Sequence, residues 1–136
     1  MGAEAENMWA QERLAVERLT LEQKVGQMVM MGVPGTEAAA AAATLIEEYN
    51  VGGIMLFAEN VVTPAQVRRL ADDLQQLART SGAGWPLFIS IDQEGGRVVR
   101  ITDGVTPLPS AMALGAAGSE ELAEQVGRIV GEELAA

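Results

Sequence analysis

The clearest indication of the fold comes from residues 52–91, which read GGIMLFAENVVTPAQVRRLADDLQQLARTSGAGWPLFISI. It begins and ends with mainly apolar runs, residues 52–57 and 87–91, whose length and flanking glycine or proline predict strands. Between the runs, Thr63 offers a helix N-cap before a proline, and apolar side chains then recur at three- and four-residue spacing. The stretch therefore predicts a strand, a helix that ends near Arg79 and a second strand parallel to the first.

The same alternation continues on both sides of this unit. Upstream, Thr20 begins a capping box that predicts a short helix, and the apolar run 28–33 predicts a strand buried on both faces. The Ala-rich residues 36–49 favour a further helix with Thr36 as its N-cap. Downstream, Ser119 starts the last helix. This order predicts an α/β fold with a parallel sheet, as in a doubly wound sheet or a (β/α)8 barrel.

Composition excludes several classes of function. The formal net charge is -10, and scattered arginines form no basic patch, so we expect no nucleic acid partner and no anionic membrane surface. The chain has no cysteine and no histidine, which removes thiolate chemistry, the usual neutral-pH proton shuttle and the commonest metal ligand. The N-terminus lacks the pattern of a secretory signal, and the apolar runs are too short to span a bilayer. The cellular compartment stays open.

The chemistry-bearing cluster is SIDQEGGRVVRIT, residues 90–102. Asp92 follows the third predicted strand, at the sheet edge where parallel α/β folds bind ligands. Its carboxylate is suited to accept hydrogen bonds from sugar hydroxyls, and the guanidinium of Arg100 is suited to donate to ring or acetamide oxygens. Gly95 and Gly96 permit a close backbone approach to a ligand. If the loop makes a helical turn, Arg97 and Arg100 share one face.

Two other interpretations remain open at this stage. Asp92 could cap the loop while Glu94 and Arg97 form an internal ion pair that only holds its shape; for Asp92 and Arg100 the location favours ligand contact. Alternatively, residues 32–36 join a strand to a helix and could cradle a phosphate, as in a nucleotide-binding α/β domain. That loop lacks the P-loop lysine and the glycine spacing of a dinucleotide site.

Four blocks carry a resemblance to a known family. They are LTLEQKVGQMVMMG, VGGIMLFAENVVTPAQVRRLADDLQ, LFISIDQEGGRVVRI and LPSAMALGA, in this order. Together they resemble the N-terminal part of glycoside hydrolase family 3, in the bacterial β-N-acetylhexosaminidase branch. The resemblance implies a partial (β/α)8 barrel domain over residues 20–136, with about three strand–helix units, preceded by a helical extension over residues 1–19. Because such barrels take roughly 250 residues, we expect a truncated chain.

The family implies removal of terminal β-linked N-acetylglucosamine, for example from cell-wall glycans, with retention of configuration and without a metal or other cofactor. Asp92 then corresponds to a residue that binds sugar hydroxyls, and Arg100 to a further substrate contact. Glu94, Gly95, Gly96 and Arg97 take a secondary, loop-shaping role.

In the family, the aspartate nucleophile and, in this branch, a histidine acid/base lie further downstream. We therefore expect no catalytic residue within the 136 residues and no hydrolysis by them alone. The partners implied are a carbohydrate and either the remainder of the barrel or a second copy that covers unpaired sheet edges. A non-catalytic sugar-binding or half-barrel interaction module is the alternative.

Overall fold

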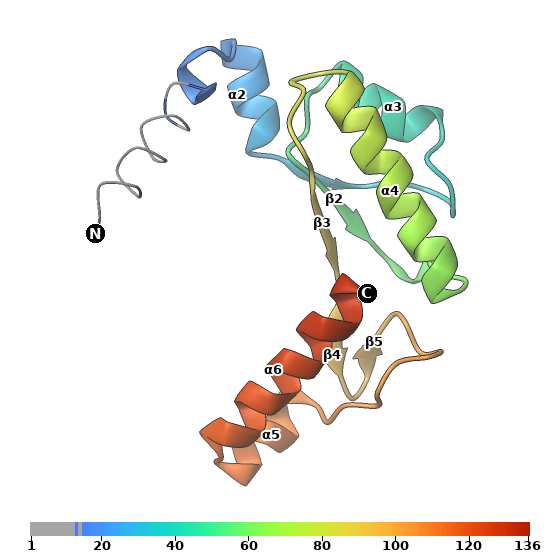
Figure 1. The fold of residues 1–136 in the computed structure, drawn as a ribbon, viewed down its shortest axis with the longest axis vertical. Helices are drawn as coiled ribbons and strands as arrows, with labels where there is room; N and C mark the ends of the chain where they lie inside the picture. The colour runs from blue at the N-terminus through green and yellow to red at the C-terminus, as the bar shows by residue number, and fades with distance from the viewer. Residues whose placement is uncertain (1–12, 14) are drawn as a thin grey trace.

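The computed structural model describes residue 13 and residues 15–136, so most of the predicted extension over residues 1–19 lies outside the described residues (Figure 1). The strands are β1 (Met30–Gly32), β2 (Gly53–Leu56), β3 (Phe88–Ile91), β4 (Gln93–Gly95) and β5 (Val98–Val99). The helices are α2 (Leu21–Gln27), α3 (Ala40–Glu47), the short 3-10 helix η1 (Ala58–Asn60), α4 (Pro64–Thr80), α5 (Ala111–Ala117) and α6 (Glu120–Ala135).

The predicted parallel sheet is confirmed. Strands β1, β2 and β3 form a three-stranded sheet in that order, and both strand pairs are parallel. The crossover helices α3 and α4 lie together on one side of it (Figure 1). The carboxyl ends of all three strands therefore lie at the same edge of the sheet, and the residues that follow the strands meet there.

The core lies between this sheet and the two crossover helices. Ile54 and Leu56 of β2 face the helices and are fully buried, together with Leu70 and Leu74 on the apolar stripe of α4. Burying a side chain of this size contributes about 1.5–3 kcal/mol. The packed core therefore covers only one face of the sheet, the face on which Ile54 and Leu56 lie.

The opposite face of the sheet carries no helix among the described residues. Met30 and Phe88 lie in one row of the register, on either side of Gly53. Phe88 is 77% exposed, and all three residues of β1 are exposed. The expectation that the run 28–33 is buried on both faces is thus wrong for the described chain, because β1 is an edge strand with one neighbour and one face uncovered.

Helix starts follow local signals with two differences. Thr20 forms the predicted capping box with Gln23, and Thr63 and Ser119 cap α4 and α6. Thr36 does not cap α3; the N-cap is Ala39, with no side-chain hydrogen bond. Gln66, the third residue after the Thr63 cap, does not complete a capping box with Thr63; its Oε1 accepts from the amide of Val62 at 2.9 Å. Its own amide donates to the carbonyl of Thr36 at 2.7 Å, so it joins two loops.

The first turn of helix α2 contains Glu22, an acid whose pKa is lowered. The backbone amide of Glu22 and the hydroxyl of Thr20 donate to the Glu22 carboxylate, and these bonds lower its pKa from the ordinary value. No helix within the described residues is long and apolar enough to cross a membrane.

The sequence did not predict the β4–β5 hairpin or α5. Ser110 caps α5 through a hydrogen bond from the amide of Ala113, but unlike α2, which has the same length, α5 has no capping box. Most of α5 and α6 lies away from the α3–α4 layer (Figure 1), but the chain end after α6 reaches α4, where Arg68 donates a hydrogen bond to the Ala136 carbonyl. The carboxylate of Glu133 accepts from the Thr106 hydroxyl at 2.6 Å and so holds α6 to the loop that contains Thr106.

Candidate functional site at the carboxyl edge of the sheet

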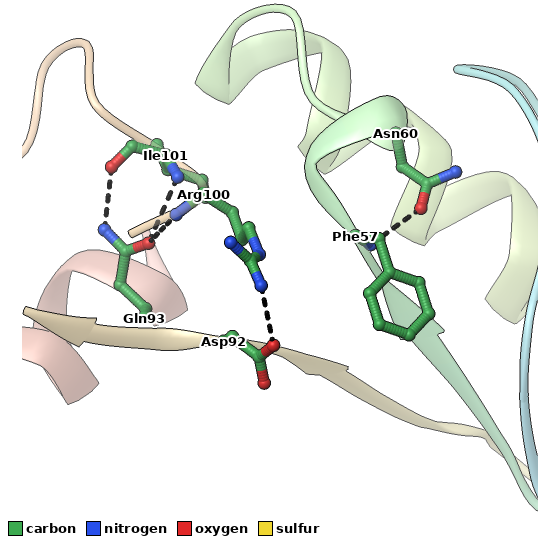
Figure 2. A network of polar contacts seen from close by, with 6 residues as sticks. All are labelled: Phe57, Asn60, Asp92, Gln93, Arg100 and Ile101. Carbon is green, nitrogen blue, oxygen red and sulfur yellow. Dashed lines mark hydrogen bonds and ion pairs between the residues drawn. The ribbon is translucent and has the colours of Figure 1, made fainter. Parts of the chain in front are cut away.

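The candidate site lies at the edge where β1, β2 and β3 end. Phe57 directly follows β2, and Asp92 directly follows β3. The strand partners just before them are Leu56 and Ile91, so the two residues occupy neighbouring positions at the edge. Figure 2 shows both with the segment that brings Arg100 back to Asp92. This is the edge at which parallel α/β folds bind ligands.

Asp92 and Arg100 form an ion pair. Nη2 of Arg100 lies 3.0 Å from Oδ2 of Asp92, and the two side chains remain 26% and 28% exposed, respectively (Figure 2). A partly exposed pair of this kind contributes little to stability, on the order of 1 kcal/mol or less. The pair instead holds the two charged groups together at the sheet edge, where each keeps about a quarter of its side chain exposed. The interpretation of Asp92 as only a cap for the loop gains no support from these contacts, and ligand contact by either residue stays a prediction.

Gln93 holds Arg100 in place, a role that sequence reasoning missed. Its Oε1 accepts from the amides of Arg100 and Ile101, each at 3.1 Å, and its Nε2 donates to the Ile101 carbonyl at 2.8 Å. The side chain thereby replaces a missing strand partner beyond the short β4–β5 ladder, which pairs Gln93 with Val99. No local signal identifies this role, because the bonded backbone lies seven and eight residues further along the chain.

Replacing Gln93 with alanine should lower the free energy of unfolding by about 2 kcal/mol, because half-buried backbone groups at residues 100 and 101 lose their partner. Urea denaturation followed by circular dichroism measures this. Gln76→Ala, at an exposed position on α4, is the matched control and should stay within about 0.5 kcal/mol of the unsubstituted protein. Equal stability of the two variants would count against the role assigned to Gln93.

The glycine pair permits a close approach, as predicted, but the neighbour is the chain itself. Gly95 and Gly96 have φ values of 80° and 60°. A Cβ on Gly95 would collide with the carbonyl oxygen of Pro109, and one on Gly96 would come within 2.6 Å of the Cβ of Ser110. The segment that starts α5 therefore packs directly on the glycine pair and closes the loop.

The two remaining loop residues behave differently from the expectations. Residues 93–99 form an antiparallel hairpin with a bulge, so the helical turn that would place Arg97 beside Arg100 is not formed. Glu94 and Arg97 are both exposed, and no ion pair joins them within the part of the chain that the structure describes. The secondary role of Glu94, Gly95, Gly96 and Arg97 towards a ligand stays a prediction.

Asn60 is a second residue that sequence reasoning missed. It is fully buried; its Oδ1 accepts from the amide of Phe57 at 2.7 Å, and its Nδ2 donates to the carbonyls of Val33 and Gly35 at 2.8 and 2.6 Å (Figure 2). The side chain thus ties the end of β2 to the loop after β1. An asparagine directly after a glutamate in a short turn resembles any loop residue, so only its burial identifies it.

The loop over residues 32–36 is not built as a phosphate cradle. Helix α3 starts at Ala40, so the loop does not lead directly into a helix N-terminus. The side-chain amide of Asn60 donates to the carbonyls of Val33 and Gly35, and that of Gln66 donates to the carbonyl of Thr36. These bonds tie the loop to the next strand–helix unit. Among residue 13 and residues 15–136, no group of three or more His, Cys, Asp or Glu side chains could hold a metal ion.

Comparison with known proteins gives consistent results. Residues 20–136 match the family described as "Glycosyl hydrolase family 3 N terminal domain". A curated relative named "Beta-hexosaminidase A" from Pseudoalteromonas piscicida is 38% identical over 136 residues, covering 85% of this chain and 23% of the relative. A "Beta-hexosaminidase" from Alkalilimnicola ehrlichii is 38% identical over 114 residues, covering 79% of this chain and 31% of the relative.

Solved structures agree with the sequence comparisons. A glycoside hydrolase family 3 β-N-acetylglucosaminidase from Paenibacillus sp. str. FPU-7 superposes with a TM-score of 0.80 and 55% identity, covering 85% of this chain and 22% of that one. NagZ from Neisseria gonorrhoeae in complex with N-trifluoroacetyl-D-glucosamine gives a TM-score of 0.65 and 29% identity, with coverage of 79% and 32%. The chain thus spans between about a fifth and a third of the length of these proteins.

Proposed function

Because this chain belongs to glycosyl hydrolase family 3 as an N-terminal domain sequence, we propose that it forms the sugar-binding part of an enzyme that removes terminal β-linked N-acetylglucosamine with retention of configuration. The relatives named above are β-hexosaminidases and a β-N-acetylglucosaminidase, which supports this class of substrate. The α/β fold with parallel strands matches the solved family structures. Residues 20–136 are the proposed partial barrel domain, and residues 1–19 a separate extension.

The observation that carries the proposal is the Asp92–Arg100 pair at the carboxyl edge of the sheet. The carboxylate accepts from adjacent sugar hydroxyls. Of the five N–H donors of the guanidinium, one contacts Asp92 and the one on Nε is buried without a partner, so the remaining Nη donors are those suited to a sugar or acetamide oxygen. Because the two groups are already paired, neither is left as an uncompensated charge when the sugar displaces water. Gln93 keeps the geometry in the absence of substrate.

Bond cleavage is assigned to residues outside this chain. Retaining glycosidases use a carboxylate nucleophile and a separate acid/base, and the branch resembled here uses a histidine for the second role. This chain contains no histidine. We therefore propose that residues 1–136 bind and orient the sugar, and that no catalytic residue and no metal or other cofactor lies among them.

The test compares two proteins, the isolated 136-residue chain and the complete polypeptide encoded by the gene that contains it. With an aryl β-N-acetylglucosaminide, the complete polypeptide should release the aryl group with retention, detected by NMR of the first sugar product, and prefer this substrate to the matching β-glucoside. The isolated chain should release none. Light scattering should show the isolated chain as an oligomer, because Met30 and Phe88 are exposed and two strand edges have no partner among the residues that the structure describes.

The outcomes separate the alternatives. Turnover by the verified pure chain would contradict the division of roles, and a compact, cooperatively melting monomer would contradict the proposed self-association. A complete polypeptide that binds N-acetylglucosamine without turnover would instead favour a non-catalytic sugar-binding module. No binding and no turnover would overturn the proposed function.

A further inference from the structure

The alternation of side chains along the strands places Phe57 and Asp92 on the same face of the sheet. Ile54 and Leu56 face helices α3 and α4, and Leu56 pairs in register with Ile91, which also packs against that core. The next residue of each strand end, Phe57 or Asp92, therefore points to the opposite, helix-free face. Figure 2 shows the Phe57 ring and the Asp92 carboxylate projecting to the same side.

The position of the Phe57 ring is determined by its neighbours. Asn60 accepts a hydrogen bond from the Phe57 amide at 2.7 Å and fixes the backbone at this point. The ring lies over Gly32, the last residue of β1, since a Cβ on Gly32 would come within 2.9 Å of Cε2 of Phe57. Even so, Phe57 is 39% exposed. A large aromatic ring held at a ligand-binding edge and left open to solvent is available for an apolar contact.

We propose that Phe57 forms an apolar wall of the sugar site and contacts the C–H groups of the pyranose that Asp92 and Arg100 bind by its polar groups. This inference rests on the proposed function and adds a residue to it. A pyranose presents hydroxyls at its rim and C–H groups on its faces, so a site that grips it needs both a polar and an apolar surface. The strand register provides these side by side, from β3 and β2 respectively.

Two substitutions in the complete polypeptide test the contact in different ways. Phe57→Ala removes the ring. Gly32→Ala leaves the ring but pushes it from its position, because the two nearest atoms to the added methyl group belong to that ring, at 2.9 and 3.4 Å, whereas the next, the Met55 carbonyl oxygen, is at an ordinary contact distance of 3.9 Å. We expect Phe57→Ala to raise KM for an aryl β-N-acetylglucosaminide, and the inhibition constant of N-acetylglucosamine, about tenfold with kcat nearly unchanged. Gly32→Ala should raise both in the same direction by a smaller factor.

Tyr49→Ala is the control, because Tyr49 is an exposed aromatic residue, at 61% against 39% for Phe57, that follows α3 and is distant from the carboxyl edge. It should leave both constants within twofold of the unsubstituted enzyme. If Phe57→Ala lowers the melting temperature sharply, the KM and inhibition constant of Gly32→Ala alone decide whether the ring contacts the sugar. Unchanged constants in both variants would overturn the contact while the proposed function stands, whereas an unsubstituted polypeptide without turnover or sugar binding would overturn the proposed function itself.

Discussion

Replacing Asp92 with asparagine is expected to lower kcat/KM of the complete polypeptide by about 10²- to 10³-fold. A hydrogen bond to a charged group is worth about 1.5–3 kcal/mol, and the substitution removes the charge from bonds to sugar hydroxyls and to Arg100. It also replaces one acceptor oxygen with a donor, which faces either the guanidinium or the sugar. The measurement is steady-state hydrolysis of an aryl β-N-acetylglucosaminide.

Asp73→Asn is the control for the loss of one negative charge. Asp73 lies exposed on α4, remote from the sheet edge, so this variant should keep the activity of the unsubstituted enzyme. The kcat/KM of Arg100→Lys should lie between those of Asp92→Asn and Asp73→Asn, because lysine keeps the positive charge but lacks the planar fork of the guanidinium. Full activity of Asp92→Asn would remove the main support for the proposed site.

Replacing Gly95 with alanine is expected to lower the free energy of unfolding by about 3 kcal/mol or more. A left-handed backbone costs a residue with a Cβ about 1–2 kcal/mol, and Gly95 has a φ of 80°. The added methyl group would also meet the carbonyl oxygens of Leu108 and Pro109, which are backbone atoms. Relief requires the hairpin and the segment before α5 to separate.

Gly84→Ala distinguishes the two causes. Gly84 has a similar φ of 72°, but nothing lies within 4 Å of an added Cβ, so this variant should lose only the backbone contribution of about 1–2 kcal/mol. Urea denaturation of the complete polypeptide measures both variants. Equal losses would mean that the contact with residues 108–109 contributes nothing, and that the glycine pair only shapes a turn.

Much of the fold was predictable because its signals are local. The caps at Thr20, Thr63 and Ser119 and the apolar stripe of α4 depend on residues three or four positions apart. The prediction for Thr36 was wrong because an N-cap depends on where the backbone turns, and here the chain stays non-helical as far as Ala39. That path is set by contacts of the loop with Asn60 and Gln66, which come from the next strand–helix unit.

The candidate site divides in the same way. Asp92 could be placed from the sequence because it follows an apolar run, and Gly95 and Gly96 because glycine pairs mark unusual backbone. The pairing of Arg100 with Asp92 required the hairpin, and the hairpin depends on Gln93, whose partners lie on the returning strand. The position of Phe57 depends on Gly32, which belongs to a different strand.

The amino-acid sequence alone was sufficient to predict the three parallel strands, the helices between them and the edge at which Asp92 lies, because periodicity and caps act within a few residues of the chain; the β4–β5 hairpin and α5 were not predicted. Which side chains meet at that edge, and which face of the sheet is left uncovered, became clear only from the tertiary structure. Those outcomes depend on strand register and on buried hydrogen bonds such as Asn60 to Val33, between residues 27 positions apart.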